Sequence, residues 1–341
     1  MNWVAVDLGK STIKATVLDK SNRPIRLSYP MGSYATTLFP SAVALTEEGN
    51  VVLGDYALQF GMYNPKLEVK DWYSSTRKTL IARAIFERIK QASIKHYSDS
   101  NIGIVLLHNN IEDPELRSIA ETVFSKDNVK TMHAGEVFKL TLSPNSKLML
   151  IADFGESGFR VILQEETKCL YNERNATLGF SSIEMLPLID PVDLSSHNSV
   201  DKRLLGQIMQ RIKILVNNGE DVILPHDMSA KGNSLANSFE QKMTIFLYQC
   251  FDECTNALKT VSKSWKNVEE VVFVGGGAHS NIIDTVFNKY IQSHGTTLVS
   301  YNSKNIGFDA QYATTNCAIQ IRELKMIGDD EFERLENENY I

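Results

Sequence analysis

The segment VAVDLG at residues 4–9 decides the fold of this chain. It is a run of apolar and β-branched residues that ends in an aspartate and a glycine, and LIADFG at 150–155 repeats the design. A third apolar run, VVFVGGG at 271–277, ends in three glycines. Such runs predict buried strands that leave a sheet through glycine turns, where bare amides and a carboxylate can meet a bound anion. The two aspartate segments predict a duplicated fold.

The composition is that of an ordinary globular protein of two lobes. The chain has 341 residues, of which 43% are hydrophobic and 22% charged. Its net charge of −6 disfavours nucleic acid as the main partner, but it leaves nucleotides open as ligands. The chain starts directly with a strand and has no apolar stretch long enough to cross a bilayer. We therefore expect a cytoplasmic protein without a membrane partner.

The cysteines do not form a metal-binding pattern. Cys250 and Cys254 are four residues apart in a helical segment, so they share one helix face. Neither a CxxC motif nor a Cys/His cluster accompanies them. We expect buried or free thiols in a reducing compartment rather than a zinc site.

Hydrophobic periodicity predicts an α/β protein with a first lobe at 1–146 and a second at 147–327. The first lobe is expected to hold strands 2–8 and 12–19, a hairpin at 42–53, a helix at 75–96, a strand at 102–107 and a helix at 113–124. Asp113 is the expected N-cap of that last helix, before Pro114.

The second lobe is expected to begin after the break at 143–146 with another strand pair around a turn at 155–158. Its other expected elements are helices at 201–217 and 236–263, a strand at 222–224, the strand of VVFVGGG, a helix from near Ser280, a strand at 297–301 and a helix at 309–326. The acidic tail at 328–341 is expected to be a solvated end.

The first glycine turn carries the side chains that a magnesium phosphate needs. Asp7 at the strand end suits a hydrated Mg²⁺, which takes one or two carboxylates and keeps several waters. Lys10 could neutralise phosphate charge, and Ser11 supplies a hydroxyl beside the amides of the turn. Asp153 is the equivalent carboxylate in the second half, and Gly155 is the glycine of its turn.

The glycine triplet at 275–277 has two interpretations. Its bare backbone could lie against a flat ring or a phosphate, or it could simply make a tight connection between a strand and a helix.

In the order and spacing of its motifs, nearly the whole chain resembles the nucleotide-binding (ATPase) domain of DnaK-type heat-shock chaperones, within the actin-like ATPase superfamily. The likeness is carried by the segments VAVDLGKSTIK (4–14), FPSAVALTEEGNVVLGDYALQFGMYNP (39–65), IADFGESGFRV (151–161), TLGFSSIE (177–184), SFEQKMTIFLYQCFDECTNAL (238–258) and VEEVVFVGGGAHSN (268–281). The resemblance implies two duplicated ribonuclease-H-like domains with a nucleotide cleft between them. It also implies ATP or ADP with Mg²⁺ as cofactors, and an unidentified protein partner that reads lobe closure.

The resemblance assigns roles to individual residues. Asp7 and Asp153 match the aspartates that hold the Mg²⁺ water shell. The phosphate cradles match Gly9, Lys10, Ser11 and Gly155, the nucleoside contacts match Gln210, Lys213 and Asn217, and the adenosine loop matches Gly275, Gly276 and Gly277. Lys78 matches the family's catalytic lysine, although the stretch before it is longer here. The alternative is an exposed helix lysine.

The chain departs from the family pattern in the parts that couple ATP to lobe movement. In the second loop, Glu156 and Ser157 replace glycines, Gly158 replaces a threonine and Arg160 replaces an aspartate. Where the family has a crossing-helix glutamate, only Glu136 is nearby, and LLHNN at 106–110 lacks the family's proline. A carboxylate near the γ-phosphate would repel it, so we expect slow turnover.

These observations predict a Mg²⁺-dependent ATP hydrolase without the family's peptide-binding domain. Three alternatives stay open: a nucleotide-binding scaffold with little or no hydrolysis, an actin-like filament protein, and a small-molecule kinase. The kinase would need a catalytic aspartate in a substrate cleft, and the sequence identifies none.

Overall fold

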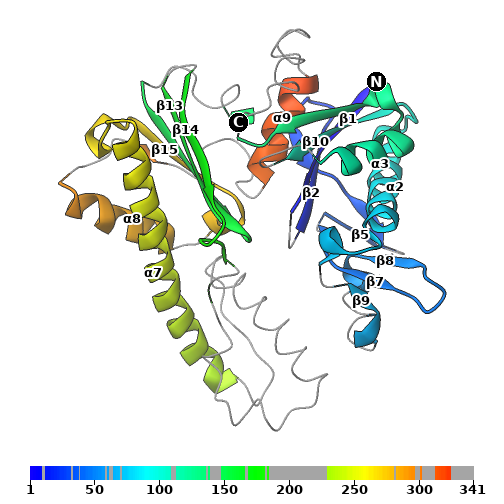
Figure 1. The fold of residues 1–341 in the computed structure, drawn as a ribbon, viewed down its shortest axis with the longest axis horizontal. Coiled ribbons are helices and arrows are strands. Elements are labelled where there is room, and N and C mark those ends of the chain that lie inside the picture. The colour runs from blue at the N-terminus through cyan, green and yellow to red at the C-terminus, as the bar shows by residue number, and fades with distance from the viewer. Residues whose placement is uncertain are drawn as a thin grey trace. The chain divides into compact units, whose positions relative to one another are not determined.

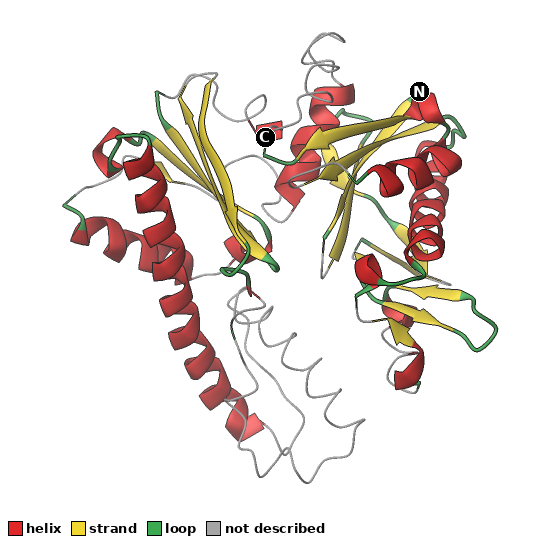
Figure 2. Ribbon diagram, in the orientation of Figure 1, coloured by secondary structure: helices red, strands yellow, loops and turns green. Residues whose placement is uncertain are grey.

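The computed structural model describes residues 1–9, 12–31, 34–37, 39–57, 60, 64–69, 71–108, 113–135, 137–138, 147–165, 168–180, 183, 229–279, 282–295, 300–301 and 312–323. The expected helix at 201–217, strand at 222–224 and acidic tail at 328–341 lie outside these residues. The chain forms two compact units, Met1–Leu142 with Tyr312–Ile341, and Ser143–Gln311. Each unit combines strands and helices, which confirms the α/β class (Figure 2).

The first unit is built on a sheet in which β1 is the central strand. Its order is β11-β10-β1-β2-β3, with β6 (Phe39–Pro40) also pairing with β2. The pairs β1–β2 and β2–β3 are antiparallel, whereas β10 runs parallel to β1 and β11 runs parallel to β10. The strands span Asn2–Leu8 (β1), Thr12–Leu18 (β2), Pro24–Arg26 (β3), Ile102–His108 (β10) and Val129–His133 (β11).

Helices cover both faces of this sheet because successive side chains of β1 point to opposite sides. Val4 and Val6 are buried with residues of α2 (Lys78–Tyr97) and α3 (Pro114–Phe124). On the other face, α9 (Ala313–Glu323) packs on β1 and β2 (Figure 1).

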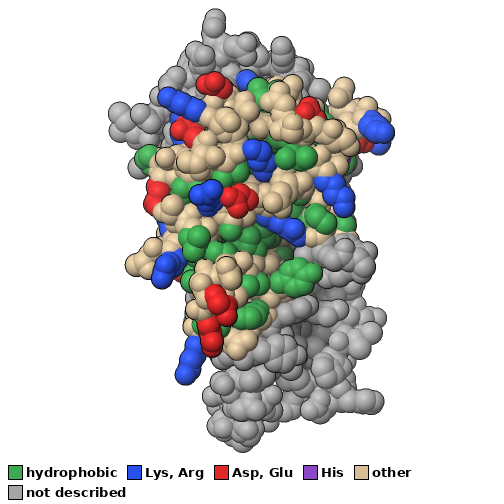
Figure 3. All heavy atoms as spheres, turned by 90° about the vertical axis from the view of Figure 1, so that its right-hand side faces the viewer, with side chains coloured by type: hydrophobic (Ala, Val, Ile, Leu, Met, Phe, Trp, Pro, Cys, Tyr) green, Lys and Arg blue, Asp and Glu red, His purple; other side chains and the backbone are tan. Residues whose placement is uncertain are grey.

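Shorter elements complete the first unit. Two further small sheets contain β4 (Tyr29–Met31) with β5 (Tyr34–Thr36), and β7 (Val43–Leu45) with β8 (Val51–Leu53) and β9 (Glu68–Val69). Single 3-10 turns lie at η1 (Pro65–Leu67), η2 (Trp72–Ser74) and η3 (Lys126–Asn128). Acidic and basic side chains are mixed over the described part of the face in Figure 3.

The second unit repeats the sheet of the first. Its order is β14-β13-β12-β15-β16, again with an antiparallel trio followed by two strands parallel to the central one. The strands span Met149–Gly155 (β12), Gly158–Glu165 (β13), Lys168–Asn175 (β14), Glu270–Val274 (β15) and Ser300–Tyr301 (β16). The shared order and directions support the duplication that the two aspartate segments predict.

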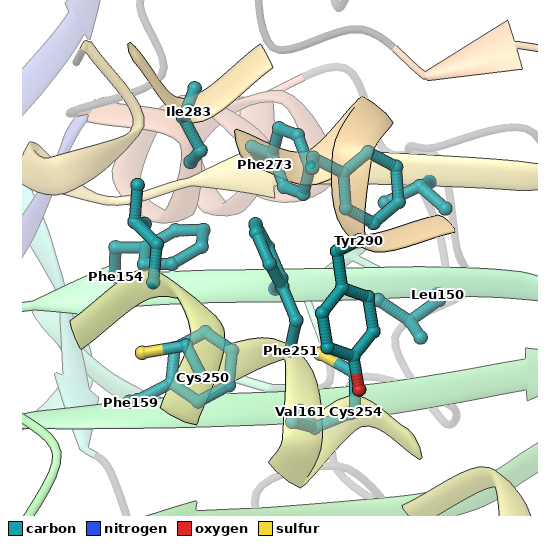
Figure 4. Close-up of a cluster of buried hydrophobic side chains, with 14 of the residues drawn as sticks. Leu150, Phe154, Phe159, Val161, Cys250, Phe251, Cys254, Phe273, Ile283 and Tyr290 are labelled. Atoms are coloured by element: carbon teal, nitrogen blue, oxygen red, sulfur yellow. The ribbon is translucent and has the colours of Figure 1, made fainter. Parts of the chain in front are cut away.

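The core of the second unit is rich in aromatic side chains. The helices α7 (Ser229–Thr260) and α8 (Ile282–Ser293) pack against each other, and the 3-10 turns η6 (Trp265–Asn267) and η7 (Gly276–His279) flank β15. Phe251 of α7 lies among Phe154, Phe273 and neighbouring rings (Figure 4). Cys250 and Cys254 lie buried in this same cluster, and burial raises the pKa of both thiols. These two cysteines therefore act as apolar packing groups.

One boundary differs from the sequence-based division. We expected residues 147–327 to form a single lobe, but residues 312–323 belong to the first unit. The reason is that α9 buries its apolar side chains, including Ile319, on the sheet of β1 and β2.

Candidate functional site

The first candidate turn follows Asp7 near the end of β1. Asp7 pairs across the hairpin with Lys14 of β2, and Lys14 Nζ lies 3.2 Å from Asp7 Oδ2. A Cβ atom on Gly9 would lie 2.5 Å from the carbonyl oxygen of Thr12, so this tight turn needs glycine. The turn therefore presents a partly buried carboxylate beside a fixed positive charge. Lys10 and Ser11 lie outside the described residues.

Lys78 is not an exposed helix lysine, because its side chain is mostly covered and is ion-paired. It is the first residue of α2, its side chain is 17% exposed, and Nζ lies 2.7 Å from Asp113 Oδ2 and 3.1 Å from Glu115 Oε2. Burial lowers the pKa of Lys78, but hydrogen bonds to Asp113 and Glu115 outweigh it, so the pKa is raised. The ammonium is thus fully charged at neutral pH and is held by two carboxylates.

Asp113 has a second task beside its ion pair. It is the N-cap of α3, and its Oδ1 accepts hydrogen bonds from the backbone amides of Glu115 and Leu116. This confirms the predicted cap before Pro114. Lys78 and Asp113 together therefore join the first turns of α2 and α3.

The second candidate turn follows Asp153 on β12. Asp153 lies opposite Arg160 of β13 on one side and Val274 of β15 on the other. A Cβ atom on Gly155 would lie 2.9 Å from the carbonyl oxygen of Gly158, so the glycine again allows the strands to close. Arg160 is a buried side chain of the sheet.

The two turns share a feature that our reading of the sequence missed. Lys14 follows Asp7, and Arg160 follows Asp153, at the same spacing of seven residues. In both hairpins this spacing makes the basic residue the direct cross-strand partner of the aspartate. The signal was present in the sequence, because a basic residue stands seven positions after the aspartate in both segments.

The second turn is held from outside by β14 and by the segment that follows this strand. Arg174 Nη2 donates to Ser157 Oγ at 2.5 Å. A Cβ atom on Gly179 would lie 2.4 Å from the carbonyl oxygen of Glu156 and 2.6 Å from the amide nitrogen of Gly158. Gly179 of the stretch TLGFSSIE therefore packs against the backbone of the turn at 156–158.

The three glycines after β15 have different local surroundings. Gly275 has a φ of +87°, and a Cβ there would lie 2.5 Å from Asp153 Oδ1. A Cβ on Gly277 would lie 1.9 Å from Cε2 of the Phe180 ring. Gly276 is exposed, and a Cβ there would meet nothing within 4 Å. Folding alone thus accounts for Gly275 and Gly277 but not for Gly276.

The structure brings some of the predicted site residues together within each unit. In the second unit Asp153, Gly155 and Gly275 are neighbours, and in the first unit Asp7 and Gly9 share one turn. The predicted nucleoside contacts Gln210, Lys213 and Asn217 lie outside the described residues, as does Glu136. Within the described residues, no group of three or more His, Cys, Asp or Glu side chains is arranged to hold a metal ion.

Comparisons with known proteins do not identify a family or a function for this chain. No protein-family model matches the sequence, and no curated protein matches it. Among the residues that the structure describes, no helix combines the length and apolar character needed to cross a membrane.

Proposed function

We propose that this protein is a Mg²⁺-dependent ATP-binding protein of the actin-like ATPase fold, with slow hydrolysis. The observation that carries the proposal is the repeated strand and turn: each unit has an aspartate on its central strand, then a glycine turn, then a cross-strand basic residue. In an α/β sheet, ligands bind at the carboxyl ends of the parallel strands. Asp7 and Asp153 both lie near the carboxyl end of a central strand, where a parallel neighbour also ends.

The donor atoms at the two turns suit magnesium. Carboxylate oxygens are hard ligands, and Mg²⁺ usually keeps several waters and uses only one or two protein carboxylates. Each of Asp7 and Asp153 is such a carboxylate in its own unit, and a hydrated ion held there would supply charge neutralisation for the phosphates. A cluster of three or more acidic side chains is not needed for this kind of site.

The surroundings of Gly276 favour a ligand next to this residue. Its lack of a side chain is required neither by a positive φ nor by close packing, and it is exposed. Bare backbone at such a position can approach a flat ring or a phosphate. In the proposed function, the loop at 275–277 contacts the adenosine, and the turn of Asp153 in the same unit contacts the phosphates.

Hydrolysis would proceed by attack of a water oxygen on the γ-phosphorus. The bond from this phosphorus to the bridging oxygen would break, so that ADP leaves, inorganic phosphate forms and the proton of the water passes to solvent. This chemistry depends on positioning and on stabilising negative charge. The backbone amides of the turns, Lys10 and Lys14 supply positive potential, and Lys78 would orient the water once released from its carboxylate partners. The hold of Asp113 and Glu115 on Lys78 favours slow turnover.

A phosphate-release assay tests the proposal. Wild-type protein is expected to release phosphate from ATP only when Mg²⁺ is present, and Asp7→Ala is expected to abolish the release. MgATP should also raise the thermal midpoint of the wild type, since a ligand that binds only the folded state stabilises it. Neither release nor a thermal shift with MgATP or MgADP in folded protein would contradict the proposal.

The second candidate is a scaffold that binds nucleotide without hydrolysis. Two observations favour it: Glu156 and Ser157 stand in a turn that Arg174 and Gly179 hold, and Lys78 is engaged by two carboxylates. A thermal shift with MgATP without phosphate release would identify this function. Restored release in Glu156→Gly would then point to the charge at residue 156 as the cause.

A further inference from the structure

Two tyrosines of the first unit bind the two ends of β1. The Tyr73 hydroxyl donates to the carbonyl oxygen of Leu8 at 2.7 Å, and the Tyr97 hydroxyl donates to the carbonyl oxygen of Trp3 at 3.0 Å. Both rings are partly buried and pack against the same hydrophobic core. The Tyr97 hydroxyl also accepts a hydrogen bond from the backbone amide of Leu18 at 3.0 Å, and only Tyr73 acts at the end of β1 that carries Asp7.

Tyr73 also belongs to the segment that leads to Lys78. It lies in η2, and its ring stacks on Trp72 with the ring centroids 4.0 Å apart. Trp72 is buried, and its Nε1 donates to Ser41 Oγ at 3.1 Å. The phenol is therefore held from behind, so its hydroxyl is a fixed anchor for Leu8 rather than a mobile surface group.

The Tyr73 hydroxyl is affected by the negative charges of Asp7 and Asp113. Burial raises the pKa of Tyr73, and the negative charges of Asp7 and Asp113 raise it further. The hydroxyl therefore stays protonated and keeps donating to Leu8 at any physiological pH. Both carboxylates also lie within electrostatic reach of this hydroxyl.

We infer that Tyr73 is a positioning residue, which fixes the turn of Asp7 and Gly9 relative to the ion-paired Lys78. Leu8 stands between Asp7 and Gly9, so its carbonyl sets the backbone that aims both. This inference rests on the proposed function. Small displacements of a group that positions a substrate or metal cost much of its effect, because the contribution depends on geometry.

The test compares Tyr73→Phe with the matched control Tyr97→Phe. Each variant loses one hydroxyl that donates to a carbonyl of β1, and each keeps its ring. Because the Tyr97 hydroxyl also accepts from the Leu18 amide, we expect Tyr97→Phe to lower the urea midpoint at least as much as Tyr73→Phe. Tyr73→Phe alone should raise the dissociation constant for MgATP, between about twofold and tenfold, which corresponds to one net hydrogen bond.

A second readout separates positioning from general loosening of the fold. Asp7 acts on nucleotide through the metal, so Tyr73→Phe should weaken ATP binding more in the presence of Mg²⁺ than in the presence of EDTA. If Tyr73→Phe does not fold, Ser41→Ala, which removes the hydrogen bond to Trp72, makes the same comparison with a milder change.

The outcomes distinguish this inference from the proposed function. Wild-type protein that binds no MgATP would overturn the proposed function and, with it, this inference. Wild-type protein that binds MgATP, with equal dissociation constants in Tyr73→Phe and Tyr97→Phe, would overturn the inference alone. An equal loss of affinity with and without Mg²⁺ would also overturn it, because it would show a merely structural role.

Discussion

Two neighbouring glycines after β15 have different surroundings, which indicates that one is needed for packing and the other is available for binding a ligand. Gly277 is in contact with the Phe180 ring, whereas Gly276 faces open space. From the three consecutive glycines alone, the sequence predicted a loop without side chains. It could not show which glycine is needed for packing and which is available to a ligand. The division depends on Phe180, which comes from a distant part of the chain and reaches the loop only through the tertiary fold.

Gly277→Ala and Gly276→Ala are therefore expected to behave in opposite ways. Gly277→Ala should lower the free energy of unfolding by about 1–3 kcal/mol, because overpacking forces a core ring to move. Gly276→Ala should change it by less than about 0.5 kcal/mol, as surface substitutions usually do, and should weaken MgATP binding. Urea denaturation and nucleotide titration of both variants make the comparison. Unchanged binding in Gly276→Ala would remove this glycine from the site.

An ion pair joins the first turn of α2 to the N-cap of α3. Asp113 both caps α3 and pairs with Lys78, and hydrogen bonds from Lys78 and from backbone amides outweigh burial to lower its pKa. The sequence predicted the cap, because Asp before Pro is a local signal. It could not predict the ion pair, since Lys78 lies on a different helix.

Two substitutions at residue 113 separate these tasks. Asp113→Asn keeps a good cap but loses the charge, and because the pair is partly exposed we expect a loss below about 1 kcal/mol at pH 7. Asp113→Ala loses the cap as well and should cost about 1 kcal/mol more. Urea denaturation measures both. An equal cost in the two variants would mean that the cap contributes nothing.

The ion pair also predicts a pH dependence. The pKa of Asp113 is lowered in the folded state, so its contribution is present above the unfolded value of about 3.9 and is lost as pH falls through the folded value. The stability difference between wild type and Asp113→Asn should therefore shrink in acid. Denaturation midpoints at pH 7 and about pH 3 give the comparison, and a constant difference would show that the charge of Asp113 is not involved.

At the scale of the whole molecule, α9 returns late in the chain to the first sheet. Thr16 of β2 is fully buried, and its hydroxyl lies 2.7 Å from Thr315 Oγ1 and 3.0 Å from Asn316 Oδ1. Local sequence patterns predicted the two repeated sheets, because the two strands of each antiparallel pair are adjacent in the sequence. The sequence-based division placed α9 in the other lobe. The hydrogen bonds of Thr315 and Asn316 with Thr16 join residues about 300 positions apart, so no local pattern reveals them.

Thr16→Val tests this docking of α9. The substitution keeps the shape but leaves polar atoms of α9 without the Thr16 hydroxyl, so we expect a loss of about 1–3 kcal/mol in the free energy of unfolding. Thr244→Val on α7 is the control, because its exposed hydroxyl bonds only within its own helix, to Glu240. Urea denaturation is the measurement. Equal stability of Thr16→Val and wild type would contradict a stabilising role for these contacts.

In the proposed function, the aspartate turn of each unit takes part in binding magnesium nucleotide. Isothermal titration with MgATP, on wild type, Asp7→Asn and Asp153→Asn, tests it most directly. We predict one MgATP bound per chain in the wild type and strongly weakened binding in each variant, with the fold of both variants intact. A folded wild type that binds neither MgATP nor MgADP, or binding that is unchanged in both variants, would contradict the claim.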